Sequence, residues 1–185
     1  MVIAAATIAP GAIAAGFAPH TAHYAMKLLS ARSSSNIESV SGDMLVHWEG
    51  DCAGWTMSNR TVFDVSYTGG ETVRITMDAT TWESLAGDRY TFLVRTMFND
   101  KESDRIEGTA RLDAEMRAAD FVNPAKKRIV LPPDTIFPTQ HTEQVLAAAG
   151  DTPGIVRATV FDGFTDGGAQ FVNAIVGGKS LAKNA

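Results

Sequence analysis

The stretch Thr61–Ala79, TVFDVSYTGGETVRITMDA, decides the fold class of this chain. Side chains alternate with a period of two through Thr61–Tyr67 and again through Val73–Ala79, which is the period of a β-strand. The pair Gly69-Gly70 separates the two runs, and paired glycines suit the tight turn of a β-hairpin. This stretch therefore predicts two antiparallel strands joined by a short turn.

The same period recurs on both sides of this hairpin. Tyr90–Phe98 alternates in the same way, with two moderately apolar faces. Further strands separated by turn residues are expected at His23–Ala31, Val40–Trp48, Ile106–Leu112, Lys127–Leu131, Ile155–Phe161 and Ala169–Val176.

One stretch, Pro138–Ala149, is typical of a helix. It opens on Pro138-Thr139, carries a short apolar stripe at its end, and is followed by Gly150 in the position of a C-terminal cap. Many short strands and one helix predict an all-β chain with one helix, in which the antiparallel sheet curls into a barrel-like or spiral wall.

Composition places the chain among globular proteins and excludes some partners. It has 185 residues, of which 45% are hydrophobic and 20% charged, and this is typical of one domain with a real core. The formal net charge is −5, and the longest basic run is Lys126–Arg128. We therefore do not expect nucleic acid as a partner.

The first 18 residues indicate export. They carry no charge, eight of them are alanine, and small residues follow the apolar run, as in a secretory signal peptide. Positions for cleavage are Ala12, Ala14, Ala15 and Ala18. A buried alanine-rich helix is one alternative, and a membrane span, which is short and interrupted by Pro10, is the other. We expect 1–18 to be a signal-peptide-like segment, and no membrane span after it.

Cys52 is the single cysteine of the sequence, whereas exported proteins usually carry cysteines in pairs that form disulfides. Its thiol is free, or it pairs with another chain, or its partner is absent from this sequence. A single cysteine cannot form a CxxC metal site. Cys52 could also be a nucleophile, with His47 five residues before it in the sequence. We favour a structural cysteine over this alternative.

Residues that carry catalysis elsewhere show no recognisable spacing here. The chain has no GxSxG elbow, and its glycine doublets read as turns rather than phosphate loops. The scattered candidates are His20, His23, His47 and His141, and the acidic group Asp100, Glu102 and Asp104 in a predicted hairpin turn. We expect no catalytic residue, no cofactor and no metal. Trp48, Trp55 and Trp82 either pack in the core or line a groove for an apolar or amphipathic ligand.

Several segments in order along the chain resemble a known family, the EipB-like cell-envelope integrity proteins. They are 18–24 (APHTAHY), 51–56 (DCAGWT), 80–84 (TTWES), 89–92 (RYTF), 106–112 (IEGTARL), 131–132 (LP), 137–141 (FPTQH) and 160–163 (VFDG). The matches span nearly all of the chain after Ala18.

The resemblance implies a periplasmic protein of Gram-negative bacteria, whose antiparallel sheet winds into a spiral or open barrel around the helix Pro138–Ala149. It also implies a disulfide between Cys52 and a C-terminal cysteine that this sequence lacks. We therefore expect a β-spiral domain over 19–176, incomplete at its C-terminal end, and a tail or truncation end at 177–185.

The function that the resemblance implies is a non-enzymatic envelope-integrity factor that binds another envelope component. The alternative is a carrier of lipid or lipoprotein that uses the inner face of a half-open barrel. A void lined by Phe63, Phe92 and Trp82 would favour the carrier, whereas a filled interior would leave the outer face or the rim for binding. An unrecognised hydrolase is a third hypothesis.

Overall fold

A computed structural model describes residues 18–32, 34–149 and 153–178 of the chain. Of the predicted signal-like segment only Ala18 is described, and of the predicted tail only Gly177 and Gly178. Gly150, the expected helix cap, also lies outside the described residues.

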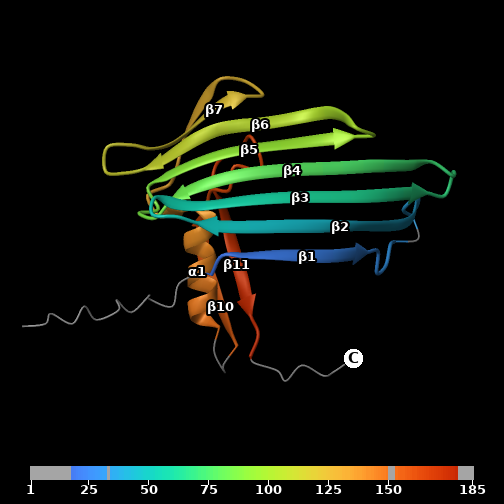
Figure 1. Ribbon diagram of the computed structural model, residues 1–185, viewed down its shortest axis with the longest axis horizontal. Coiled ribbons are helices and arrows are strands. Elements are labelled where there is room, and N and C mark those ends of the chain that lie inside the picture. Colours follow the sequence, from blue (N-terminus) through green and yellow to red (C-terminus); the bar gives the residue numbers. More distant parts are fainter. Residues whose placement is uncertain (1–17, 33, 150–152, 179–185) are drawn as a thin grey trace, which may run out of the picture.

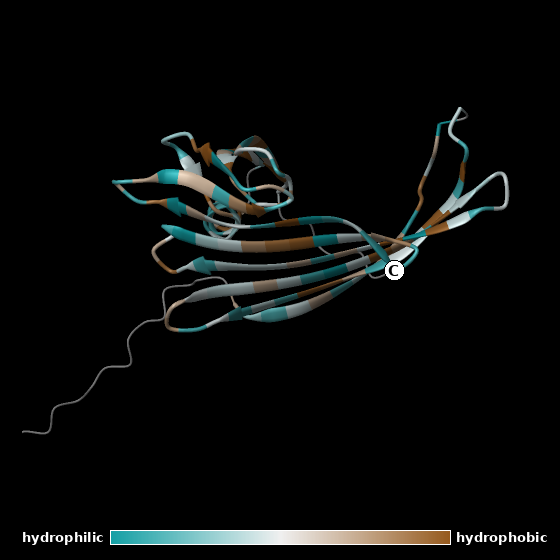
Figure 2. Cartoon of the chain, turned by 90° about the horizontal axis from the view of Figure 1, so that it is seen from above, coloured by the Kyte–Doolittle hydropathy of each residue, from teal (hydrophilic) through white to brown (hydrophobic). Residues whose placement is uncertain are grey.

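Eight strands form one large antiparallel sheet, and each strand pairs with the next along the chain (Figure 1). They are β1 (His20–Lys27), β2 (Ile37–Gly50), β3 (Gly54–Tyr67), β4 (Thr72–Ser84), β5 (Arg89–Phe98), β6 (Lys101–Leu112), β7 (Arg117–Asn123) and β8 (Lys127–Val130). Seen from above, this sheet is curved and open (Figure 2).

A second, smaller sheet follows in the order β11-β10-β9. It consists of β9 (Thr135–Ile136), β10 (Gly154–Val160) and β11 (Gln170–Val176), and β9 pairs with β10 in parallel. The helix α1 (Pro138–Ala148) packs against β10 and β11. Figure 1 shows these three elements together at one end of the large sheet.

The predicted fold class is confirmed, since the described part of the chain is mostly antiparallel sheet with a single helix and the sheet does not close into a barrel. The predicted hairpin forms with Thr61 opposite Met77. The first strand was placed wrongly, because it runs over His20–Lys27 and not His23–Ala31. The sequence reasoning also missed β7 and the separation of the last strands into a second sheet.

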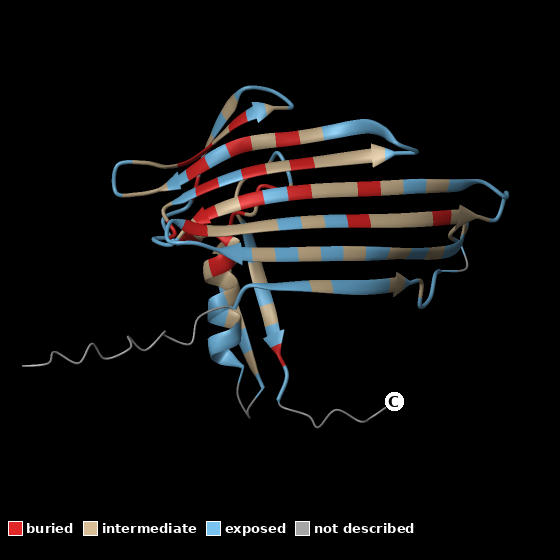
Figure 3. Cartoon of the chain, viewed as in Figure 1, coloured by how far each residue is buried: buried red, intermediate tan, exposed pale blue. Residues whose placement is uncertain are grey.

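The large sheet has two different faces. On β5, the side chains of Tyr90, Phe92 and Val94 are buried on one face, which we call the inner face, while Leu93 and Arg95 point to the opposite, outer face. Rings pack on the inner face, with 4.9 Å between the centroids of Tyr90 and Phe137. The core cluster comprises Ala79, Tyr90, Phe92, Val94, Ile106, Ala110, Ala119, Phe121, Leu131, Phe137 and Phe161. Figure 3 shows the buried positions concentrated toward the end of the sheet where α1 begins.

The helix is enclosed only where it begins. The Glu83 carboxylate on β4 accepts hydrogen bonds from the backbone N–H groups of Thr139, at 2.7 Å, and Gln140, at 3.3 Å. By contrast, Leu146 in the last turn is 53% exposed. The sheet is therefore open around the helix, as expected, and it encloses the start of α1 rather than its whole length. The open sheet covers the start of the helix, and β10 and β11 pack on one side of it.

Candidate functional site

Charged residues from neighbouring strands pair across the outer face. Arg74 on β4 holds the Asp64 carboxylate on β3 through two hydrogen bonds of 2.8 Å. These bonds lower the pKa of Asp64 below its usual value. Arg128 on β8 pairs with Asp120 on β7 in the same way, and the bonds lower the pKa of that carboxyl as well. The outer face thus carries cross-strand ion pairs between arginines and carboxylates.

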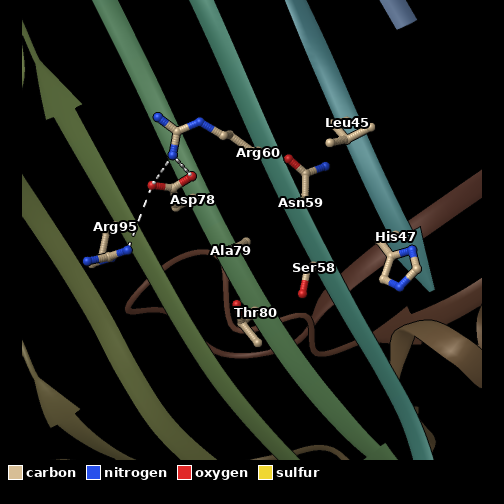
Figure 4. Close-up of a pocket in the computed structure, with 9 residues that line it drawn as sticks. All are labelled: Leu45, His47, Ser58, Asn59, Arg60, Asp78, Ala79, Thr80 and Arg95. Carbon is tan, nitrogen blue, oxygen red and sulfur yellow. Dashed lines mark hydrogen bonds and ion pairs between the residues drawn. The ribbon is translucent and has the colours of Figure 1, made fainter. Parts of the chain in front are cut away.

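A shallow hollow of about 270 Å³ lies among these ion pairs, over β2–β5 (Figure 4). Its lining combines two arginines, one carboxylate, one imidazole and two hydroxyls with one exposed leucine. The residues are Leu45, His47, Ser58, Asn59, Arg60, Asp78, Ala79, Thr80 and Arg95. The hollow lies on the face opposite to the aromatic core, because Arg95 alternates with the buried Phe92 and Val94 along β5.

Two guanidinium groups flank one carboxylate in this hollow. Nη1 of Arg60 lies 2.9 and 3.1 Å from the two carboxylate oxygens of Asp78, whose side chain is only 19% exposed. Nη2 of Arg95 lies 3.8 Å from Asp78, which is beyond hydrogen-bonding distance. Within the described residues, Arg95 makes no other ion pair and no hydrogen bond. Asp78 is therefore hydrogen-bonded by Arg60, and the guanidinium N–H groups of Arg95 remain available to hydrogen-bond a ligand.

Polar and aromatic side chains continue the site along the strands. Ser58 lies opposite Thr80 in the β3–β4 register, next to the pair of Arg60 and Asp78. Both residues are exposed, and among the described residues neither hydroxyl has a hydrogen-bond partner. Trp82 follows Thr80 on the same face of β4 and is half-buried.

The 51–56 segment explains how Trp82 is placed. Asp51 accepts hydrogen bonds from the N–H groups of Ala53, at 2.7 Å, and Gly54, at 2.8 Å, which close the turn and lower the pKa of Asp51. A side chain at Gly54 would put its Cβ 2.9 Å from the Trp82 indole and 2.2 Å from the backbone oxygen of Glu83. Glycine thus allows the indole to lie over the β3 backbone.

The four histidines do not form one site. Nδ1 of His47 lies 2.6 Å from the Thr21 hydroxyl and its Nε2 lies 2.7 Å from Glu49. This order of hydroxyl, imidazole and carboxylate is also found in nucleophilic enzymes. Here, however, the side chains of His47 and Glu49 are 47% and 67% exposed. The surrounding water weakens the electrostatic interactions through which such groups would activate a nucleophile. His23 pairs with Asp43, His20 bonds the Ala18 carbonyl, and His141 lies on α1.

The remaining predicted candidates lie at the β5–β6 hairpin and in the β2–β3 turn. Asp100 occupies the β5–β6 turn with a positive φ of 64°, while Glu102 and Asp104 lie on β6, where Glu102 pairs with Arg105. Cys52 is exposed in the β2–β3 turn, so it is not a core residue, and its expected disulfide stays a prediction.

The described part of the chain contains no group of three histidine, cysteine, aspartate or glutamate side chains placed to hold a metal. In these residues, too, no helix is long and apolar enough to cross a membrane.

Phe63, Phe92 and Trp82 do not line a common void, which is the arrangement that would have favoured a carrier. Phe92 is fully buried against Phe161, with 5.5 Å between ring centroids. Trp82 belongs to the outer face, because it lies opposite Thr91 in a register that puts Phe92 opposite Thr81. Only Phe63 of the three residues is a half-buried inner-face side chain. The hollow at Arg60, Asp78 and Arg95 was not predicted, since their proximity depends on the register of three strands.

Comparisons with known proteins agree with this structure. The family model described as EipB-like matches residues 11–185. The cell envelope integrity protein EipB of Brucella abortus (strain 2308) is 27% identical over 176 residues, which cover 94% of this chain and 62% of that protein. A crystal structure of a beta-barrel-like protein of a domain of unknown function from Brucella abortus has a TM-score of 0.80 and 24% identity, covering 89% of this chain and 68% of that one. This chain therefore belongs to the EipB-like family.

Proposed function

We propose that this protein maintains the integrity of the cell envelope from the periplasm, as a non-enzymatic protein that binds another envelope component. Family membership and the name of the Brucella abortus relative support the envelope role. The signal-like pattern of the first 18 residues supports export to the periplasm.

The observation that carries the binding role is the open hollow on the outer face. At its centre the guanidinium of Arg95 has no hydrogen-bond partner in the described residues, next to the paired Arg60 and Asp78. The inner face at the same end of the sheet is filled by aromatic rings. Binding is therefore assigned to the outer face, and the carrier alternative has less support.

Deletion and rescue in the bacterium that encodes this chain tests the proposal. Loss of the gene is expected to lower survival in detergent, and a plasmid carrying the gene to restore it. The double variant Arg60→Gln/Arg95→Gln is expected to fail in rescue.

The matched control is Arg74→Gln/Arg128→Gln, which removes the same charge from other outer-face ion pairs and is expected to rescue. Equal melting temperatures and equal protein levels are required of both variants. Detergent survival that is unaffected by the deletion contradicts the envelope role.

A further inference from the structure

The residues around the hollow form a strip along the middle of the outer face. Asp78, Thr80 and Trp82 follow one another at every second position of β4, about 6.6–6.8 Å apart. Ser58 and Arg60 flank them on β3, and Arg95 flanks them on β5. We call these six residues the outer strip.

The charges of the outer strip favour an anionic ligand. Asp78 neutralises one of the two arginines, which leaves one positive charge in excess on a chain whose net charge is −5. The fork of Arg95 is planar and matches the two oxygens of a carboxylate. Asp78 lies 3.8 Å from Arg95, and both of its carboxylate oxygens are already bound by Arg60. A ligand carboxylate that binds Arg95 therefore displaces no existing hydrogen bond of that guanidinium.

The hydroxyls of the outer strip favour a ligand rich in hydroxyl groups. Ser58 and Thr80 face each other across two strands and are exposed. Each hydroxyl can both donate and accept, as the hydroxyls of a sugar can. An inorganic anion would occupy Arg95 and leave this pair unused.

Trp82 completes the strip with an apolar surface. Its indole lies over Gly54, where no Cβ lifts it from the sheet, and it is half-buried. A flat ring held in this way presents a rigid apolar area beside the polar groups, and the C–H face of a sugar ring is a suitable partner for it. An acidic peptide would satisfy Arg95 but would bring no array of hydroxyls.

We infer that the outer strip binds an anionic saccharide, a sugar chain that carries carboxylates. Arg95 holds a carboxylate, Ser58 and Thr80 hydrogen-bond the sugar hydroxyls, and Trp82 packs against a sugar ring. The inference deepens the proposed function, since it names the chemistry of the envelope component that the outer face binds.

Calorimetric titration of the purified chain with trigalacturonate tests the inference. Arg95→Gln is expected to weaken binding about tenfold or more, because it removes charge-assisted hydrogen bonds. The double variant Ser58→Ala/Thr80→Ala is expected to weaken binding as well, and Arg128→Gln to leave it unchanged. Neutral maltotriose and triglutamate are expected to bind more weakly than trigalacturonate.

Three results would overturn the saccharide class: no binding of trigalacturonate, equal binding by Arg95→Gln, or triglutamate binding as tight as trigalacturonate. Any of these combined with failed rescue by Arg60→Gln/Arg95→Gln in cells would leave the envelope role intact. Failure of the deletion to affect the envelope, with trigalacturonate bound through Arg95, would leave the saccharide site and remove the envelope role.

Discussion

At the scale of single residues, Glu83 joins the sheet to the helix. Glu83 is 3% exposed, and its carboxylate caps the first turn of α1 from β4. Burial raises the pKa of Glu83, and the N–H groups of Thr139 and Gln140 oppose that rise. The ionised form therefore costs stability in the folded state, although it makes the two hydrogen bonds.

This sign gives a pH dependence for Glu83→Gln. A pKa that is higher in the folded than in the unfolded state makes the Glu83 contribution largest below the ordinary value of 4.5, and this contribution is lost as pH rises through the folded pKa. Relative to the native chain, Glu83→Gln is thus expected to gain stability as pH rises from 4.5, until Glu83 is ionised. Urea unfolding across that range measures the difference, and the same trend in the exposed variant Glu71→Gln would show that net charge is its cause.

Cys52 gives the second residue-scale prediction. The thiol is exposed in the β2–β3 turn, so alkylation of the folded chain is expected to proceed at a rate close to that in urea. Mass spectrometry of a timed alkylation measures both rates. Strong protection of Cys52 in the folded chain would contradict the exposed placement.

At the scale of elements, the β10–β11 loop closes over β5. Gly163 has a φ of +68°, and a Cβ at this position would lie 2.5 Å from Cγ of the buried Phe92. Gly163→Ala is therefore expected to cost about 1–3 kcal/mol of unfolding free energy, through strain and overpacking. Gly69→Ala is the control, since no atom lies within 4 Å of its Cβ position, and it is expected to change stability by less than about 0.5 kcal/mol. Equal stability of the two variants in urea would contradict this packing.

Elements with a strong local signal were predictable from the sequence. The β3–β4 hairpin has alternation and a glycine turn, and α1 has its opening proline. By contrast, β7 reads Arg-Ala-Ala-Asp-Phe-Val-Asn, whose alanines and aspartate have little preference for strands. The parallel pairing of β9 with β10 joins residues that lie 24 positions apart, such as Thr135 and Thr159, and no local pattern reports it.

The candidate site was harder to predict than the fold. The period of two places Arg60, Asp78 and Arg95 each on a face of its own strand, but bringing them together requires the register across β3, β4 and β5. The same register moves Trp82 away from the inner face where Phe92 lies. A shift of one residue between β3 and β4 would put Arg60 and Asp78 on opposite faces, and a shift between β4 and β5 would put Trp82 on the same face as Phe92.

At the scale of the whole molecule, the two faces of the large sheet differ in composition and burial. The inner face at the α1 end packs into an aromatic core, while the outer face presents the hollow and its arginines. The central claim is that this outer face contacts another component of the envelope in the living cell.

Site-specific photocrosslinking in growing cells tests that claim most directly. A photoreactive phenylalanine derivative at Thr80 lies in the hollow, and the same group at Val130, which is 80% exposed on the outer face of β8, is the matched control. We predict an adduct of higher mass from Thr80, its loss in combination with Arg95→Gln, and none from Val130. Equal adducts from both positions, or none from Thr80, would contradict the claim that the hollow is the binding surface.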